Sequence, residues 1–132
     1  MDPPSDGDVT REGLIEAARE LAPLVRAEAE RSEKASRIPE HLYRALIERG
    51  FFRTLLPKRY GGYEFEPAVA ARIVLELATG CGSTGWVSSI LGVHNWHLAL
   101  FDQQAQDDVW GDDPTVRVSS SYAPMGAGTV VD

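Results

Sequence analysis

The chain has 132 residues, 43% of them hydrophobic, and a formal net charge of −7, which is typical of one globular domain. The acidic balance argues against a nucleic-acid surface, which needs a basic stripe, and the basic residues form no cluster that would mark a membrane surface. Cys81 is the single cysteine, which excludes an internal disulfide and favours a reducing compartment. The polar, acidic first residues do not form a signal peptide. We therefore expect a cytoplasmic protein.

The first third of the chain predicts two helices after a disordered N-terminus over residues 1–9, which are rich in Pro, Gly and Asp. Thr10 can cap the first helix, and apolar residues then recur at three- and four-residue steps. Pro23 should kink or split this helix because it removes a backbone hydrogen bond. Pro39 suits the first position of the next helix, and Gly50 should end it in the left-handed conformation.

The middle of the chain predicts a buried connector over residues 51–56 and a loop over residues 57–62, followed by a helix from Pro67 to about Gly80. Further on, Asp102 should cap a short helix over residues 103–110. Together these elements predict a mainly α-helical domain that spans residues 10–114.

An uncharged stretch over residues 81–101 stands out within that domain. Ser83 is expected to cap its helix, which is apolar all round and should therefore be buried. Gly85 and Gly92 would let a flat or bulky group approach the backbone. The same helix carries two tryptophans and two histidines: Trp86, Trp96, His94 and His97. It is our first candidate for a functional site.

After Pro114 the sequence changes from a helical to a strand pattern. Residues 116–122 alternate in polarity, which predicts a strand, and a second strand should start at Thr129. One and a half strands do not make a stable sheet. Residues 115–132 are therefore expected to begin a β middle domain that this chain truncates.

Three segments resemble a known family. They are residues 55–62 (LLPKRYGG), residues 85–97 (GWVSSILGVHNWH) and residues 117–126 (RVSSSYAPMG). The first, with the helix that follows it, resembles the acyl-CoA dehydrogenase fold in general. The other two are similar to the oxygenase components of two-component flavin-dependent phenol monooxygenases, and most of all to those that act on steroid-derived phenols.

This resemblance implies a helical domain, a β-barrel-like middle domain and a C-terminal four-helix bundle, assembled as a homotetramer. It also implies that a separate flavin reductase supplies the reduced flavin. We expect this flavin to be FMN, with FAD as the alternative. Oxygen and this flavin would form a C4a-hydroperoxide that hydroxylates a phenolic substrate ortho to its hydroxyl. Roughly two-thirds of the family's length lies beyond this chain.

The resemblance also assigns site residues. Trp86 would lie against the flavin, and His94 beside the phenol, where it would favour the phenolate. Ser120, Ser121 and Tyr122 would contact the isoalloxazine edge. Taken alone, the same residues also suit a core or lid aromatic, a core histidine and a polar edge strand. No metal site is expected, because no carboxylates stand near the two histidines in sequence.

Two other functions stay open at this point. One is an acyl-CoA dehydrogenase proper, although such enzymes typically carry a Thr-Glu-Pro-type flavin segment where this chain has residues 120–124 (SSYAP). The other is a helical interaction module without catalysis. The oxygenase component of a flavin monooxygenase is the leading interpretation.

Overall fold

A computed structural model of the chain describes residues 9–120, 123 and 125–131. Its described part contains six α-helices and two short 3-10 turns: α1 (Arg11–Ala27), α2 (Ala29–Ala35), α3 (Glu40–Glu48), η1 (Phe51–Arg53), η2 (Lys58–Tyr60), α4 (Pro67–Gly80), α5 (Gly82–Leu98) and α6 (Gln103–Trp110). The predicted mainly helical fold is confirmed. In this part of the chain no helix is both long and apolar enough to span a membrane.

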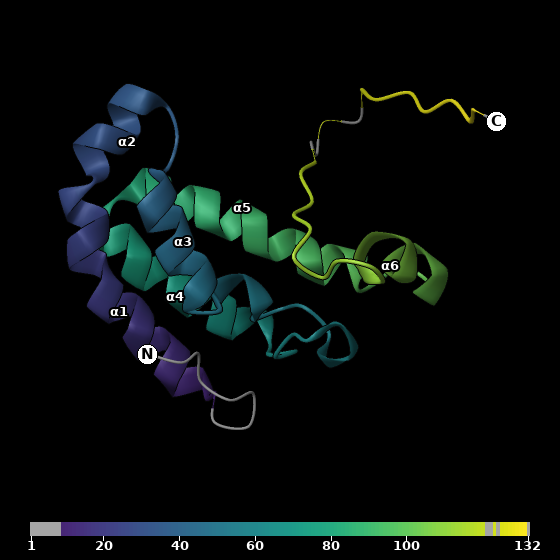
Figure 1. Cartoon of the computed structure of the whole chain (residues 1–132), viewed down its shortest axis with the longest axis horizontal. Helices are drawn as coiled ribbons and strands as arrows, with labels where there is room; N and C mark the ends of the chain where they lie inside the picture. The colour runs from purple at the N-terminus through teal and green to yellow at the C-terminus, as the bar shows by residue number, and fades with distance from the viewer. Residues whose placement is uncertain (1–8, 121–122, 124, 132) are drawn as a thin grey trace.

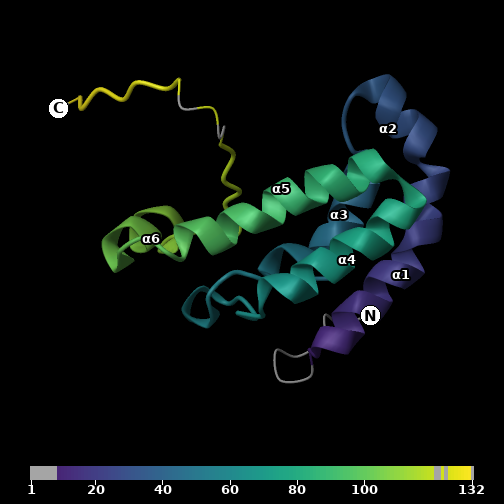
Figure 2. The same cartoon turned by 180° about the vertical axis from the view of Figure 1, so that it is seen from behind.

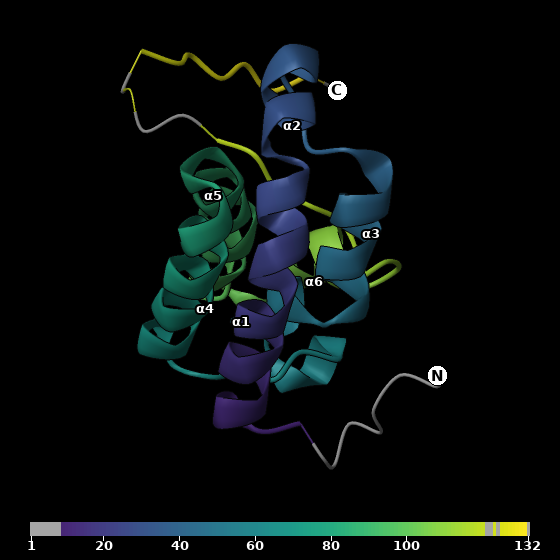
Figure 3. The ribbon, with the colours of Figure 1, turned by 90° about the vertical axis from the view of Figure 1, so that its left-hand side faces the viewer.

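The helices pack around α1. In Figure 3, α4 and α5 lie on one side of α1 and α3 on the other, and Figure 1 shows α6 at the far end of α5. The core is formed by the buried apolar side chains of α1, α3, α4 and the connector between α3 and α4. They include Leu14, Ile15, Leu21, Val25, Leu42, Leu46, Phe51, Phe52, Val69, Ile73 and Leu77.

Helix α1 begins as predicted, with the backbone N–H of Gly13 donating to Thr10 Oγ1 at 3.0 Å. Pro23 was expected to kink or split this helix, and the split is wrong, because α1 continues to Ala27 and breaks only at Glu28. The missing proline N–H costs one hydrogen bond, whereas the buried face on either side of it holds the helix against its neighbours. The charged residues after the break form the separate helix α2.

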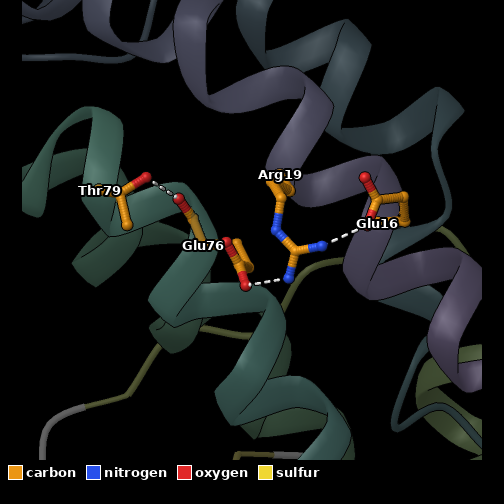
Figure 4. Close-up of polar contacts among 4 residues, drawn as sticks. All are labelled: Glu16, Arg19, Glu76 and Thr79. Atoms are coloured by element: carbon orange, nitrogen blue, oxygen red, sulfur yellow. Dashed lines mark hydrogen bonds and ion pairs between the residues drawn. The ribbon is translucent and has the colours of Figure 1, made fainter.

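The contact between α1 and α4 is mostly apolar, with a polar edge that Figure 4 shows. Arg19 pairs with Glu16 and, at 2.7 Å, with Glu76 of α4. Thr79 lies next to this pair in α4, and its hydroxyl donates to the backbone oxygen of Glu76 at 2.7 Å. Exposed ion pairs of this kind contribute at most about 1 kcal/mol. The apolar burial between the two helices therefore carries most of their association.

The connector and loop between α3 and α4 match their predictions. Gly50 takes the left-handed conformation with φ of 76°, and the apolar connector residues are buried. In the loop, a Cβ on Gly62 would collide with the carbonyl group of Leu56. The second glycine of the Arg-Tyr-Gly-Gly sequence is thus required by a close approach of two backbone segments.

This loop is held against α6 by side-chain contacts. Arg59 Nη2 donates to Gln106 Oε1 at 2.9 Å, and the Tyr60 hydroxyl donates to the carboxylate of Asp107. The buried Gln106 also donates through Nε2 to the carbonyl oxygens of Ala99 at 3.2 Å and Phe101 at 2.8 Å. One glutamine side chain therefore joins the loop, the turn after α5 and α6.

The strands predicted after Pro114 are absent from the described residues. Residues 116–120 and 125–131 form no strand, and Val130 is 94% exposed. A strand pattern produces a strand only where a neighbour pairs with its backbone, and Figure 1 shows residues 125–131, at the yellow end of the chain, running away from the helices. At the other end, the predicted disorder falls mostly on residues outside the described part, and Val9 packs against the core.

Candidate functional site

Helix α5 carries the candidate site, and its burial differs from the prediction. It begins after Cys81, so Ser83 lies inside the helix and does not cap it. The expectation of burial on all sides is wrong, because Trp86 is 68% exposed and Trp96 39% exposed. The buried side chains of this helix are instead small or polar: Thr84, Gly85, Ser88, His94 and Asn95.

Close packing against α4 explains why a glycine lies on the buried face near the start of α5. A Cβ on Gly85 would lie 2.8 Å from Ala78 Cβ, so α4 occupies the space that this glycine opens. Gly92 has no neighbour within 4 Å of such a Cβ. Of the two glycines expected to admit a flat group, only Gly92 leaves open space.

The structure brings two of the predicted site residues together. His94 is 2% exposed, and its Nε2 lies 3.4 Å from Ser120 Oγ in the segment after α6. The ring of His97 lies 5.7 Å from that of His94, tilted by 43°. The hydroxyl of Ser120 can therefore bias which tautomer His94 adopts. Two further predicted residues, Ser121 and Tyr122, lie outside the described residues.

Trp86 does not join this pair. It precedes His94 by eight residues on the same helix, about 12 Å along the axis. Its indole is mostly exposed, so the interpretation as a core aromatic does not hold for this chain. An exposed flat ring is suited to stacking against another planar group.

Asn95 connects α5 to the connector before α4, a contact that the sequence did not predict. It is 1% exposed, and its Nδ2 donates to the carbonyl oxygen of Phe52 at 2.7 Å. The ring of Phe52 contacts the guanidinium of Arg117 at 5.1 Å. Phe52 thus lies between α5 and the segment that carries Ser120. The available sequence signal was an amide side chain inside an uncharged run.

A mostly apolar cavity of about 420 Å³ lies between η1, α4 and α5, and it was also not predicted. Ser88 and Gly92 contribute to its wall from α5, and Ser88 Oγ is buried without a hydrogen-bond partner. Finding this cavity requires three elements to be placed in space, which spacing along the chain cannot do. Among the residues that the structure describes, no group of three or more His, Cys, Asp or Glu side chains could hold a metal ion.

Comparison with known proteins identifies the fold. The sequence profile of the acyl-CoA dehydrogenase N-terminal domain matches residues 10–111. The flavin-dependent monooxygenase oxygenase subunit HsaA of Rhodococcus jostii is 60% identical over 112 residues, which are 85% of this chain and 29% of that protein. The oxygenase component of the FADH(2)-dependent resorcinol hydroxylase of a Rhizobium species is 36% identical over 119 residues, 90% of this chain and 29% of that protein.

A solved structure agrees with these sequence matches. The crystal structure of the HsaA monooxygenase from M. tuberculosis superposes with a TM-score of 0.87 at 51% identity, covering 93% of this chain and 34% of that one. The chain thus spans about 29% of the length of the two curated relatives above. With a profile match over most of its length and this superposition, the chain belongs to the acyl-CoA dehydrogenase N-terminal domain family.

Proposed function

We propose that this chain is the amino-terminal part of the oxygenase component of a two-component flavin-dependent phenol monooxygenase. The observation that carries the proposal is the contact between the buried His94 and the hydroxyl of Ser120, at 3.4 Å. It places a proton acceptor and a polar partner on two segments that the resemblance assigns to the site. The names of the relatives support an oxygenase over an acyl-CoA dehydrogenase proper.

In this proposal His94 binds the phenolic substrate. An imidazole can accept the hydrogen bond of a phenol hydroxyl, and drawing this proton toward nitrogen raises the electron density of the ring that is to be hydroxylated. Ser120 supports His94 through its contact with Nε2. Burial of His94 excludes water from the proton it shares with the substrate.

The residues of this chain also suit a flavin. The exposed indole of Trp86 offers a flat surface to the isoalloxazine ring, and the exposed Ser120 offers a hydroxyl. Reduced flavin, when bound, would supply the activation of molecular oxygen. We propose contacts from Trp86, Ser120, Ser121 and Tyr122, of which the last two stay predictions from the resemblance.

The remaining components follow from the same proposal. A separate flavin reductase would deliver the reduced flavin, and the substrate would be a phenol of steroid origin. FMN was the first expectation, whereas the name of the Rhizobium relative favours FAD, so both are to be compared. A homotetramer for the full-length protein and a cytoplasmic location stay predictions.

A chimaeric oxygenase tests the proposed function. Residues 10–131 of this chain would replace the matching segment of the Rhodococcus jostii subunit, to which the chain is 60% identical. With reduced flavin, we expect phenol hydroxylation by the chimaera and no tight flavin binding by the isolated 132-residue chain. A folded chimaera without hydroxylation, whichever flavin is used, would favour the interaction module, and micromolar flavin binding by the isolated chain would contradict the need for later domains.

Trp86→Ala in the chimaera is expected to weaken reduced-flavin binding by about 0.5–1.5 kcal/mol, because ring packing is lost. The melting temperature should hardly change, since the side chain is mostly exposed. Flavin titration together with thermal unfolding measures both effects. Trp96→Ala on the same helix is the matched control and should leave flavin affinity unchanged. If Trp86→Ala lowered only the melting temperature, the flavin contact would be excluded.

A further inference from the structure

Cys81 opens into a cavity that the proposed function does not use. It is the residue immediately before α5 and is partly buried. The cavity measures about 560 Å³ and lies between α2, the turn after it and the first turns of α5; Figure 2 shows α2 above the junction of α4 and α5. Its charged lining residues are Glu30, Glu33 and Arg37.

Cys81 immediately precedes α5, so its side chain lies beside the free backbone N–H groups of the first turn of that helix. The backbone N–H of Thr84 has the largest effect, followed by the Thr84 hydroxyl and the backbone N–H of Ser83, and together these nearby donors lower the pKa of the Cys81 thiol from its ordinary value. Burial and the carboxylate of Glu33 oppose this shift in pKa. The net effect favours the thiolate, as amides at a helix N-terminus do.

Thr84 provides the geometric evidence that this site can hold a negative charge. It lines the same cavity and is 1% exposed, and its Oγ1 lies near the sulfur but has no hydrogen-bond partner in the structure. A buried hydroxyl without a partner costs about 1–3 kcal/mol. A negatively charged sulfur, or an oxygen bound to it, would accept the hydrogen bond that is otherwise missing.

We propose that Cys81 is a reactive thiolate that hydrogen peroxide oxidises to a sulfenic acid. The thiolate attacks one oxygen of the peroxide, an S–O bond forms, and the O–O bond breaks. The leaving hydroxide takes a proton and becomes water, while the sulfur loses two electrons and the peroxide gains them. The proposal rests on Cys81, the cavity beside it and the first turn of α5, so it does not depend on the oxygenase proposal.

The first test is the pH dependence of alkylation. Cys81 is the single cysteine, so the rate of iodoacetamide labelling of the 132-residue chain reports on it alone. We expect the midpoint of the rate profile to lie at lower pH than in a peptide of residues 76–88, which has the same sequence without the fold. Thr84→Val should move the midpoint of the chain to higher pH.

Thr79→Val is the matched control for that variant. Thr79 precedes Cys81 by two residues, but its hydroxyl bonds to the backbone oxygen of Glu76, so its loss should leave the midpoint unchanged. A midpoint in the folded chain at or above that of the peptide would overturn the proposal. So would equal shifts in the Thr84 and Thr79 variants, because the Thr84 hydroxyl would then have no special role.

The second test detects the oxidised product. The chain is treated with hydrogen peroxide in the presence of dimedone, which forms a covalent adduct with sulfenic acids, and the adduct is measured by mass spectrometry. We expect an adduct on Cys81 that forms faster than in the peptide and is lost in Cys81→Ser. Slower adduct formation in the folded chain than in the peptide would contradict the proposal.

Discussion

Replacing His94 with alanine in the chimaeric oxygenase is expected to slow phenol hydroxylation by about 10²–10⁴-fold, the usual range for loss of an acid–base group. His94 is nearly completely buried and contacts Ser120, so no water readily replaces its nitrogen. Oxygen consumption should continue, with a larger share ending as hydrogen peroxide. The change is measured as the amount of hydroxylated product and of hydrogen peroxide formed per oxygen consumed.

Two further variants distinguish a loss of hydroxylation from a loss of protein stability. His97→Ala removes the neighbouring imidazole, whose ring lies 5.7 Å away, and should affect mainly the melting temperature. Ser120→Ala leaves His94 in place and should cost less hydroxylation than His94→Ala, because Ser120 acts through the histidine. If the His94 variant still used all of the consumed oxygen for hydroxylation, the proposed role of His94 in substrate binding would be excluded. An equal loss of hydroxylation rate in the His97 variant would exclude it as well.

Trp110→Ala is expected to lower the free energy of unfolding by about 3–5 kcal/mol, as large aromatic truncations in a core do. Trp110 is 1% exposed, and its ring packs against Tyr60 at 5.2 Å. Its loss leaves a cavity beneath the loop that Tyr60 and Asp107 hold against α6. Urea unfolding followed by circular dichroism measures the change.

Two other tryptophan variants serve as controls for Trp110→Ala. Trp86→Ala removes the same side chain from an exposed position and should change the stability by no more than about 0.5 kcal/mol. Trp110→Phe keeps most of the volume and removes the buried Nε1, which has no hydrogen-bond partner, so it should cost much less than Trp110→Ala. Equal losses in the Trp110 and Trp86 alanine variants would contradict the buried position of Trp110.

Much of the helical framework could be predicted because its signals are local. Thr10 and Asp102 cap their helices through the next turn, and Gly50 takes a conformation that other residues avoid. Each of these effects depends on neighbours within a few residues. Pro23 was misjudged because the packing that maintains α1 around it comes from other elements of the chain.

The candidate site was predicted less completely. Hydropathy marked α5 as important but could not show which side faces α4, so the exposure of Trp86 and the burial of small and polar residues were missed. The contact between His94 and Ser120 joins residues 26 positions apart. Only the resemblance placed both in one site, and it assigned Ser120 to the flavin without its contact to the histidine.

The three-way contact of Gln106 has a consequence for the native-state dynamics of the domain. Because its amide group bonds to Arg59, Ala99 and Phe101, the loop cannot open without breaking contacts to α6 and to the turn after α5. These segments should therefore open as one cooperative unit. Hydrogen exchange of their backbone amides would then report a common opening free energy, separate from that of α1 and α4.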